Sequence, residues 1–442
     1  MKIQSVRGFK DWLPEEFAKY RYLIDIADRY LSAGGFKQIK LPILEKTELF
    51  IRSIGEVTDI VQKETYSFED RNKEWLTLRP EATAGICRSI IEHGLHTKPK
   101  PLKFYTVGPM FRHERPQKGR LREFYQVDAE YFGELNPYVE AEIIILAKNI
   151  LEEPFKENGI SFEGFKIEVN SLGCSKCRPN YRSALVEFLK EKKQDLCEVC
   201  KNRLERNPLR VLDCKVETCK QVVSESPVIS DFFCEECKEH FEKLKEILKA
   251  LGINFEVNPR LVRGLDYYTR TIFEIKGKGL GAQDTVAAGG RYDNLLQELG
   301  GPFLPAIGFA IGLERWAIVV FENIPGLAEK LENSVLPDVF LAVLGEENFL
   351  EGMKIADKLR RKGLKTEATY EKKGLKGLLK TADKLKAKTA LIVGEKELKE
   401  KNAILKNMRT GEQKEVKFED FDNLAEKVLN FINDWKEERN AL

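Results

Sequence analysis

The segment from Leu261 to Ile275, with the sequence LVRGLDYYTRTIFEI, constrains this chain more than any other stretch. Arg263 is followed by a glycine at which the backbone can turn, and Asp266 and two adjacent tyrosines come next. Polar and apolar residues then alternate over 271–275, which predicts a strand that carries this group. Such a cluster can hold a polar, aromatic amino acid. The plain alternative is a surface loop with a stabilising Arg–Asp pair ahead of an ordinary strand.

A second constraint is a pair of predicted strands joined by a strongly basic turn. The strands run over Leu102–Arg112 and Phe124–Gly133 and are rich in β-branched and aromatic residues. The turn carries basic side chains that would repel one another without an anionic partner: His113, Arg115, Lys118, Arg120 and Arg122. A solvated, charged hairpin is the plain alternative to an anion-binding loop.

Two further segments combine glycine with arginine near predicted strand ends. Gly308–Arg315 predicts a strand of small residues that leads into a helix, with glycines that would let a ligand lie close against the sheet. Ala288–Asp293 holds a Gly-Gly pair, which alone predicts only a turn. The sequence has neither a GxxxxGK[ST] phosphate loop nor a Rossmann fingerprint after a strand. These absences exclude the two commonest alternative nucleotide-binding folds.

Together with Arg79–Gly85 (RPEATAG), these segments resemble the histidyl-tRNA synthetase family of the class II aminoacyl-tRNA synthetases. The resemblance implies an α+β catalytic core built on an antiparallel sheet, an α-rich insertion domain and a C-terminal α/β domain with a mixed sheet. A predicted helix begins near Asp11 and ends at Gly34, and a strand is expected over Gly35–Pro42. This helix and strand resemble motif 1, which forms the dimer interface in class II enzymes.

The resemblance assigns catalysis and ATP binding to a small group of residues. Arg112 would grip the α-phosphate and Arg315 the γ-phosphate, because a guanidinium binds phosphate oxygens as a fork and stays charged. Arg263 and Mg²⁺ would join Arg112 in neutralising the α-phosphate. Glu114 would face the adenine amino group, and Gln126 completes the expected ATP contacts.

The same resemblance places a bound histidine among Glu81, Ala82, Thr83, Gln126, Glu130, Tyr267 and Tyr268. Glu81 and Thr83 would receive the α-ammonium group, and a carboxylate at Glu130 could hold an imidazole N–H. Gln126 and Glu130 are four residues apart on one predicted strand, so their side chains share a face. Ala82 stands where relatives often carry glycine, which should only stiffen the turn. Gln117 and Arg120 are expected to approach the acceptor end of tRNA.

The expected domain boundaries follow changes in periodicity along the chain. Residues 1–172 and 259–325 would form the two parts of the catalytic core, and 173–258, where helical spacing dominates, the insertion domain. A linker over 326–337 precedes alternating strands and helices over 338–442, which resemble an anticodon-binding domain. Residues 354–388 hold thirteen Lys and Arg against four acidic residues, so this part could contact RNA backbone. A solvated, Lys-rich helix face is the alternative.

Eight of the nine cysteines fall in four close pairs between residues 174 and 237. The first two pairs, Cys174/Cys177 and Cys197/Cys200, are separated by 19 residues, a spacing that fits a ribbon-type zinc site. A structural zinc on these four residues is one interpretation, and the remaining four cysteines could form another site. Buried free cysteines are the alternative. Catalytic zinc is not expected, because no His or carboxylate completes an open site.

Length and charge set weaker limits. A chain of 442 residues has room for two or three domains, and a formal net charge of +2 means that a nucleic-acid partner would meet a local basic patch. No apolar run approaches the roughly 18 residues of a membrane span, and the N-terminus lacks a signal-peptide core. A cytoplasmic protein without membrane contact is expected.

By resemblance, the expected activity is that of an ATP-dependent ligase in a homodimer. Histidine would be activated to histidyl-adenylate with release of pyrophosphate and then transferred to the 3′ end of tRNA(His). The alternative of another class is a synthetase-like regulatory subunit of histidine biosynthesis, which senses histidine without this catalysis. Such subunits lack the anticodon domain and commonly lose parts of the Arg-Gly-Leu-Asp-Tyr-Tyr segment. This chain has that segment and a region that resembles the anticodon domain. A class II synthetase for another amino acid would have to explain Glu81, Tyr267 and Tyr268.

Overall fold

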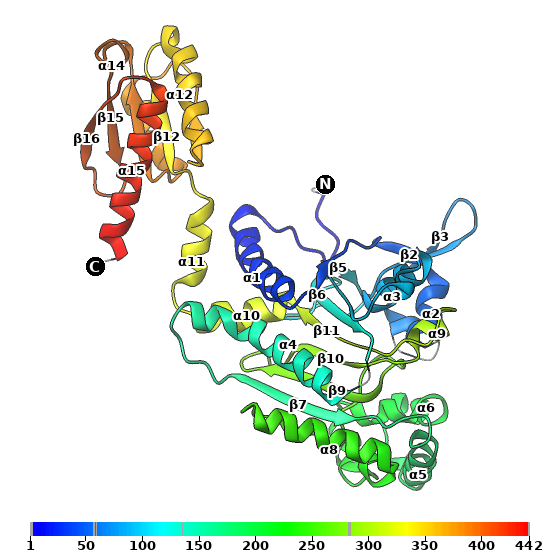
Figure 1. Cartoon of the computed structure of the whole chain (residues 1–442). Helices are drawn as coiled ribbons and strands as arrows, with labels where there is room; N and C mark the ends of the chain where they lie inside the picture. Colours follow the sequence, from blue (N-terminus) through cyan, green and yellow to red (C-terminus); the bar gives the residue numbers. More distant parts are fainter. Residues whose placement is uncertain (1–2, 56–57, 59, 135, 282–283, 441–442) are drawn as a thin grey trace. The chain divides into compact units, whose positions relative to one another are not determined.

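The computed structural model describes residues 3–55, 58, 60–134, 136–281 and 284–440, with side chains up to residue 435. The chain forms two compact units, residues 1–328 and 329–442, each with its own hydrophobic core (Figure 1). Among the described residues, no helix is both long enough and apolar enough to span a bilayer.

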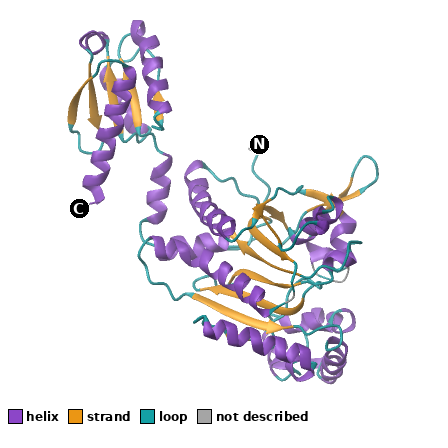
Figure 2. Ribbon diagram, in the orientation of Figure 1, coloured by secondary structure: helices purple, strands orange, loops and turns teal. Residues whose placement is uncertain are grey.

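The first unit is built on a large sheet that has eight strands within the described residues. Its order is β1-β5-β6-β11-β10-β9-β7-β8, and the six inner strands pair antiparallel, while β1 and β8 pair parallel at the edges. Figure 2 shows the strands in orange and the helices in purple. In that order, the bounds are Lys37–Gln38, Leu102–Phe111, Glu123–Phe132, Ala306–Gly312, Thr285–Arg291, Thr269–Gly277, Phe165–Ser171 and Glu256–Val257. The expected α+β core on an antiparallel sheet is therefore confirmed.

Three helices of the first unit pack against one another and against this sheet: α1 (Pro14–Ala33), α4 (Pro137–Glu157) and α10 (Leu313–Asn323). Pro14 begins α1, where its missing N–H costs nothing, and Asn136 caps α4 by accepting from two backbone N–H groups at 3.0 Å. The indole N–H of Trp316 in α10 donates to the carbonyl of Leu151 in α4 at 3.2 Å. These helices fix the rear of the strands that carry the site.

The predicted strand over Gly35–Pro42 is much shorter than expected. Only Lys37 and Gln38 form a strand, β1, which pairs with β5, and Ile39 adds one further backbone hydrogen bond to Tyr105. Pro42 has no N–H to continue the ladder, and the segment lies at a sheet edge, where pairing is available on one side only. The Gly-Gly pair expected to form a turn instead lies inside β10.

A smaller layer completes the first unit beside the central strands. It contains the helices α2 (Thr47–Ile54), α3 (Thr83–Glu92) and α9 (Leu295–Glu298), a π-helical turn over Ile60–Glu64 and a short 3₁₀ turn over Leu95–Thr97. A sheet of β2 (Leu44–Lys46), β4 (Trp75–Leu78) and β3 (Tyr66–Glu69) lies next to them. Three side chains of this sheet are exposed although they are large and apolar: Leu44, Phe68 and Trp75.

Between β7 and β9 the chain forms a helical region with its own small core. Its helices are α5 (Arg178–Glu191), α6 (Glu198–Arg206), α7 (Glu217–Ser224) and α8 (Glu235–Ala250), with 3₁₀ turns at Lys193–Asp195, Pro208–Asp213 and Ile229–Phe232. The helices predicted from spacing at 181–190 and 240–251 are thus present as α5 and α8. Helix α8 packs on α4, so this region is joined to the large sheet by more than its two chain ends.

The second unit has a five-stranded mixed sheet in the order β13-β12-β14-β15-β16. In that order, the strands span Thr366–Ala368, Val339–Val343, Thr389–Val393, Asn402–Asn407 and Gln413–Lys417. The helices are α12 (Phe349–Arg361), α13 (Leu375–Lys384), α14 (Glu395–Glu400) and α15 (Phe421–Asn440), and α11 (Leu327–Glu332) and the 3₁₀ turns 333–335 and 346–348 complete the described elements. The alternation expected from the sequence is confirmed, but it did not include α14 or the hairpin of β15 and β16, whose strands are short and largely polar.

Candidate active site

Strand β6 carries the acidic centre of the candidate site. Gln126, Asp128 and Glu130 alternate along it and share one face, as the period of two in a strand requires. Asp128 and Glu130 are only 2% exposed. Among the described residues, Gln126 Oε1 and Asp128 Oδ2 have no hydrogen-bond partner. Buried acceptors without partners are costly, so this face is prepared for a ligand that donates hydrogen bonds.

Glu130 is held by two hydroxyl donors. Thr83 donates to one carboxyl oxygen at 2.6 Å, and the hydroxyl of Tyr292 donates to the other. Burial raises the pKa of Glu130 to about 8, although these two hydrogen bonds act in the opposite direction. Gly308 lies opposite Glu130 on β11, and a Cβ there would fall 1.5 Å from the carboxylate. The glycine expected to make room for a ligand therefore makes room for this carboxyl group.

Glu81 lies in the turn that leads into α3, and it is 4% exposed. Its carboxylate accepts from the backbone N–H of Ala84 at 3.0 Å, which places the negative charge at the first turn of the helix. Burial raises the pKa of Glu81, and the hydrogen bonds from Ala84 and Thr83 oppose this rise. Ala82 is fully buried at the same turn. Of the predicted residues in this turn, Thr83 contacts Glu130 and the charge of Glu81 acts on it, whereas Ala82 packs in the hydrophobic core.

Two buried tyrosines follow the Arg-Gly-Leu-Asp stretch and lie beside Glu81 and Glu130; these residues, with Thr83 and the face of β6, are called the acidic pocket below. The ring centroids of Tyr267 and Tyr268 are 4.7 Å apart, and Tyr267 also makes an edge-to-face contact with Tyr292 at 5.6 Å. Tyr267 lies close enough to Glu81 and Glu130 for their charges to raise the pKa of its hydroxyl after burial, the main cause. The pocket therefore combines carboxyl groups with aromatic walls, as an imidazole-bearing ligand requires.

Next to the acidic pocket, four arginines approach one another: Arg112, Arg120, Arg263 and Arg315. Burial, together with repulsion from Arg120 and Arg112, lowers the pKa of Arg315 to about 10. Arg263 and Arg112 also repel each other. Arg315 donates to the carbonyls of Gly119 at 3.0 Å and Thr285 at 2.8 Å, which fixes its direction. A cluster of like charges of this kind favours a polyanionic ligand.

Arg263 pairs with Glu274 of β9, and its Nε has no hydrogen-bond partner among the described residues. Burial lowers the pKa of Arg263, but the attraction of Glu274 outweighs it and leaves the pKa above its usual value. The alternative of an Arg263–Asp266 pair is wrong. Asp266 instead accepts from the side-chain amide of Asn207 at 2.9 Å.

The basic turn between β5 and β6 is folded back on itself. Gln117 and Arg120 exchange two backbone hydrogen bonds of 3.0 and 2.9 Å, and the side chains of Arg120 and Glu114 form an ion pair. Lys118 pairs with Glu322 of α10 at 2.7 Å. Intramolecular acids thus neutralise part of the charge that the sequence left without a partner, while Arg112 stays directed at Pro80, to whose carbonyl it donates at 3.0 Å.

A hollow of about 630 Å³ opens beside Arg263 within the first unit. Its lining comes from Leu172, α5, the end of α6 with residues 207–210 and residues 262–266. It is strongly basic: Arg178, Arg182, Arg206, Arg210 and Arg263. Asp266 is the acidic side chain of this lining. An anionic chain could therefore reach the arginine cluster from this side.

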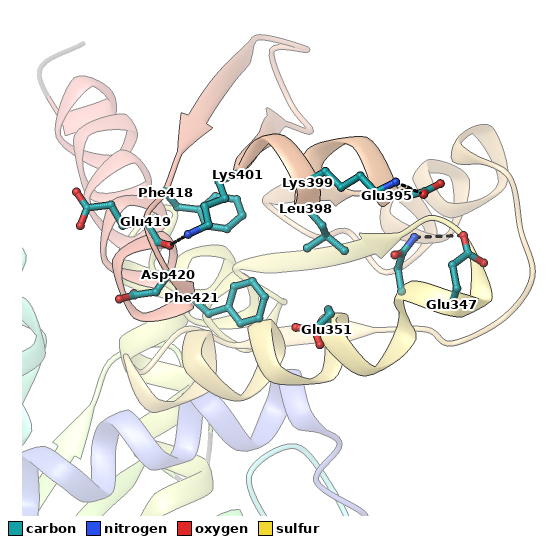
Figure 3. A pocket seen from close by; sticks show the side chains of 11 residues that line it. Glu347, Glu351, Glu395, Leu398, Lys399, Lys401, Phe418, Glu419, Asp420 and Phe421 are labelled. Carbon is teal, nitrogen blue, oxygen red and sulfur yellow. Dashed lines mark hydrogen bonds and ion pairs between the residues drawn. The ribbon is translucent and has the colours of Figure 1, made fainter.

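The second unit has a hollow of another character. It encloses about 610 Å³ and is rimmed by carboxylates from Glu347, Glu351, Glu395, Glu419 and Asp420, with Leu398, Phe418 and Phe421 at its apolar floor (Figure 3). Lys401 donates to the backbone carbonyl of Glu419 at 2.6 Å, and Lys399 pairs with Glu395. This acidic rim would repel a phosphate.

The structure groups the cysteines differently from the expectation. Cys174 and Cys177 meet Cys234 and Cys237, whereas Cys197 and Cys200 meet Cys214 and Cys219. A single site made of Cys174, Cys177, Cys197 and Cys200 is therefore wrong. Sequence spacing could not show this, because the helices between the pairs decide which pairs come together.

Four residues of the site were not among the predicted ones: Arg79, Asp128, Glu274 and Tyr292. Asp128 could have been found from its position between Gln126 and Glu130 on the same strand face, and Tyr292 from the Ala288–Asp293 segment. Arg79, whose charge acts on Asp128, and Glu274, which pairs with Arg263, also lie inside segments singled out from the sequence, Arg79–Gly85 and Leu261–Ile275, but the resemblance assigned them no role.

Comparison with known proteins agrees with this geometry. Residues 8–316 match the family described as histidyl-tRNA synthetase, and residues 338–428 match the anticodon binding domain. A histidine–tRNA ligase of Aquifex aeolicus is 49% identical over 417 residues, which cover 94% of this chain and 99% of the relative. That of Caldanaerobacter subterraneus subsp. tengcongensis is 45% identical, with 94% and 97% coverage. The crystal structure of apo S. aureus histidyl-tRNA synthetase has a TM-score of 0.78 at 34% identity, covering 97% of this chain and 100% of that one.

Proposed function

The chain belongs to the histidyl-tRNA synthetase family and is a histidine–tRNA ligase, and we propose how the residues of its site divide that reaction. The enzyme activates histidine with ATP to histidyl-adenylate and pyrophosphate and then transfers histidine to the 3′ end of tRNA(His). One observation supports this division of roles: a buried acidic group of residues and a cluster of arginines lie next to each other. Buried carboxyl groups with aromatic neighbours lie beside four arginines, of which Arg112 repels each of the other three.

We propose that the acidic pocket binds histidine. Glu81 and Thr83 would accept hydrogen bonds from the α-ammonium group, with the unpartnered Oε1 of Gln126 as a further acceptor. Glu130 would accept an N–H from the imidazole, since Tyr292 and Thr83 hold its carboxyl group in place. Tyr267 and Tyr268 would enclose the ring, and Ala82 would support the turn beneath it. Specificity follows because an amino acid without a ring N–H leaves Glu130 buried without that partner.

The arginine cluster would bind the triphosphate of ATP. Arg112 and Arg263 are assigned to the α-phosphate, where negative charge is reorganised when the histidine carboxylate attacks and pyrophosphate leaves. Arg315, at the junction of β11 and α10, is assigned to the γ-phosphate. Glu114 and Gln126 would contact the nucleoside. Mg²⁺ would arrive with ATP and be held mainly by phosphate oxygens and water, and it would neutralise charge on the leaving pyrophosphate.

The transfer step would use the adenylate itself as base. The arginines of the cluster stay charged and cannot accept the proton of the terminal ribose hydroxyl. A phosphate oxygen of the adenylate would take that proton as the hydroxyl attacks the acyl carbon, and AMP leaves. The basic hollow beside Arg263 gives the acceptor end of tRNA a route to this point, with Gln117 and Arg120 in the turn as further contacts.

We also propose a homodimer that works in the cytoplasm, where charged tRNA is used in translation. The small sheet of the first unit leaves Leu44, Phe68 and Trp75 exposed by 37%, 46% and 59%. Exposed apolar groups on neighbouring strands are typical of an interface, and two-fold pairing is the commonest oligomer. Phe17 of α1, the helix that resembles motif 1 and was expected at the dimer interface, is 49% exposed.

The regulatory-subunit alternative is not favoured. A histidine sensor has no use for an arginine cluster that can bind the phosphates of ATP, nor for a domain that matches anticodon-binding domains. ATP–pyrophosphate exchange measured with each of the twenty amino acids separates the possibilities. Exchange that depends on histidine is expected, followed by charging of tRNA(His). Histidine binding without exchange would contradict the assignment, and exchange with another amino acid would contradict the specificity.

A further inference from the structure

The two groups of cysteines lie away from the acidic pocket and have no part in the reaction described above. The first cluster, Cys174, Cys177, Cys234 and Cys237, joins the beginning of the inserted helical region to its last helix. The second cluster, Cys197, Cys200, Cys214 and Cys219, lies wholly within that region, between α6 and α7. Each cluster has two half-buried and two buried members.

The sulfur atoms have the spacing of ligands around one tetrahedral ion. In each cluster all four lie within 4.8 Å of one another. Measured pairs are 3.7 Å for Cys174–Cys177, 3.8 Å for Cys174–Cys234 and 3.9 Å for Cys197–Cys214. A zinc–sulfur bond of about 2.3 Å places tetrahedral ligands about 3.8 Å apart. A disulfide would need about 2.05 Å, and all eight thiols are free.

The surrounding backbone is arranged to stabilise thiolates. The N–H of Lys176 donates to Cys174 at 3.4 Å, that of Cys234 to Cys177 at 3.1 Å, and that of Cys197 to Cys219 at 3.2 Å. Such N–H to sulfur hydrogen bonds stabilise a metal-bound thiolate more than a neutral thiol, whose sulfur is a weak acceptor. Gly173 adds a steric requirement, because a Cβ at this position would lie 2.8 Å from the Cβ of Cys177.

Charge also points to a bound ion in the first cluster. Four thiolates around a divalent cation carry a net charge of −2, which needs nearby positive groups. Two arginines lie beside this cluster: Arg178 directly follows Cys177, and Arg270 pairs with Glu236, the residue before Cys237. A multinuclear iron–sulfur cluster fits less well. A [4Fe–4S] cluster binds each thiolate to a different iron and a [2Fe–2S] cluster binds the two pairs to different irons, so some of the sulfurs would be farther apart. A tetrahedral all-sulfur set suits a single zinc ion, and the experiment below tests a single iron as the alternative.

We propose that each cluster holds one structural Zn²⁺, so that the chain carries two. The first zinc would fasten the start of α5 and α8 beside the active-site strands. Arg178, next to Cys177, donates to the carbonyls of Leu172 at 3.3 Å and of Tyr268, and the carbonyl of Gly173 accepts from the N–H of Arg270 at 3.0 Å. The second zinc would order the helical region alone. Zinc binding would contribute directly to the folding of both segments.

The experiment measures metal content of the full-length enzyme purified without chelator under reducing conditions. Elemental analysis and native mass spectrometry should give two zinc ions per chain, and X-ray absorption should show sulfur-only coordination at about 2.3 Å. Cys234→Ser and Cys214→Ser should each retain one zinc. Cys87→Ser is the control, since Cys87 is a buried cysteine of α3 outside both clusters, and it should retain two.

The outcomes distinguish the proposal from its alternatives without reference to activity. Absence of zinc from wild type, both as purified and after incubation with excess Zn²⁺ and a reductant, would overturn it. Iron in place of zinc would overturn the identity of the ion, and a mass deficit from disulfides would overturn metal binding. If wild type holds one zinc per chain, one cluster is empty. The empty cluster is the one whose Cys→Ser substitution leaves the zinc content at one, and its assignment as a zinc site would be overturned. Wild-type stoichiometry decides the proposal even if a variant does not fold.

Discussion

At the residue scale, the acidic pocket keeps carboxyl groups in a state that costs stability in the absence of ligand. Burial raises the pKa of both Asp128 and Glu130 to about 8, so both are largely protonated at neutral pH. A histidine that donates hydrogen bonds would favour the charged forms and lower these pKa values on binding. The pocket therefore exchanges some folding stability for ligand affinity, as functional sites commonly do.

The first prediction concerns Glu130→Gln. The folded state holds a proton on Glu130 up to about pH 8, whereas the unfolded chain releases it near pH 4.3, so wild-type stability falls as pH rises through this window. The variant does not titrate at this position. Its free energy of unfolding relative to wild type should therefore be at least about 1 kcal/mol higher at pH 8 than at pH 5. Its KM for histidine should rise about tenfold or more, because a charged hydrogen bond is lost, with little change in the KM for ATP.

Chemical denaturation at both pH values and exchange kinetics measure these effects. A control is Glu163→Gln, an exposed carboxylate outside the site, which should change neither quantity. A stability difference between Glu130→Gln and wild type that does not depend on pH would contradict the raised pKa. An equal rise in the KM values for histidine and ATP would contradict the assignment of Glu130 to the amino acid.

The second prediction concerns Arg263→Ala. The loss of a positive charge beside the reacting phosphate should cost on the order of 3–4 kcal/mol, or 10²–10³ in the rate of adenylate formation. Arg263→Lys should recover only part of this loss, because an ammonium group cannot form the fork that guanidinium makes with phosphate oxygens. Arg361→Ala, which removes an exposed arginine paired with Asp357, is the control for charge alone. Pyrophosphate exchange close to wild type in a folded Arg263→Ala protein would refute the role.

Much of the site could be predicted from the sequence because its residues lie in short, contiguous segments. The segments around Glu81, Arg112 and Tyr267 each bring their own local structure, and the fold only has to place them together. Contacts between distant segments could not be predicted. The hydroxyl of Tyr292 donates to Glu130 only because β6 and the end of β10 come together in one sheet, and neither residue signals the other in the sequence.

At the element scale, α8 is joined to the large sheet by a buried polar cluster. His240 of α8 contacts the carboxylate of Glu140 in α4 at 2.7 Å, and Arg291 of β10 binds the same oxygen at 2.6 Å. Burial, with repulsion from Arg291 and Arg270, lowers the pKa of His240 to about 4. His240 is therefore neutral at pH 7 with its Nε2 within hydrogen-bond distance of Glu140, so the inserted helical region is attached to the core through a group whose protonation costs folding stability.

The third prediction concerns the pH dependence of this attachment. The unfolded chain takes up a proton at His240 near pH 6.5, while the folded chain resists it down to about pH 4, so stability is lost as pH falls through this range. His240→Gln keeps an N–H donor for Glu140 but does not titrate. Between pH 7 and pH 5 it should lose about 2 kcal/mol less stability than wild type. Denaturant unfolding at the two pH values measures this difference, and identical losses would contradict the lowered pKa.

Element prediction from the sequence succeeded where periodicity was long and failed at edges and pairings. The strands β5 and β6 agree with expectation to within one residue at each end, and helix α1 to within three. The strand before Pro42 was overestimated, because one hydrogen-bonded edge supports little of it. The hairpin of β15 and β16 was missed, since Asn402–Asn407 and Gln413–Lys417 alternate weakly. The cysteine pairs were matched wrongly because helices, not spacing, bring them together.

At the scale of the whole molecule, the exposed apolar side chains of the small sheet bear on assembly. The fourth prediction is that Phe68→Ser combined with Trp75→Ser converts a dimer into a monomer and lowers exchange activity, because each replaces an apolar contact of about 1–3 kcal/mol per subunit. Leu350→Ser, at a residue that is 63% exposed in the second unit, is the matched control and should remain a dimer. Sedimentation velocity and exchange rates decide between these outcomes. A wild-type enzyme that is monomeric at working concentration and fully active would contradict the proposal.

The last prediction separates the two units by function. The second unit has its own core around Leu341, Leu391 and Val428 and matches an anticodon-binding domain, while the acidic pocket and the arginine cluster lie entirely in the first unit. Removal of residues 338–442 should therefore leave pyrophosphate exchange measurable but raise the tRNA concentration needed for charging. In wild type, tRNA affinity should fall as salt rises, because basic residues such as those of 354–388 displace counterions from RNA.

Two controls make this last experiment decisive. The mass of the truncated protein must be compared with that of wild type, so that loss of a dimer is not mistaken for loss of an RNA contact. Charging must also be measured at several tRNA concentrations, because loss of an RNA contact raises the KM for tRNA, whereas damage to the active site lowers exchange as well. Unchanged charging after truncation would refute the role of the second unit in tRNA binding. Equal loss of exchange and charging would show that the second unit supports the active site itself.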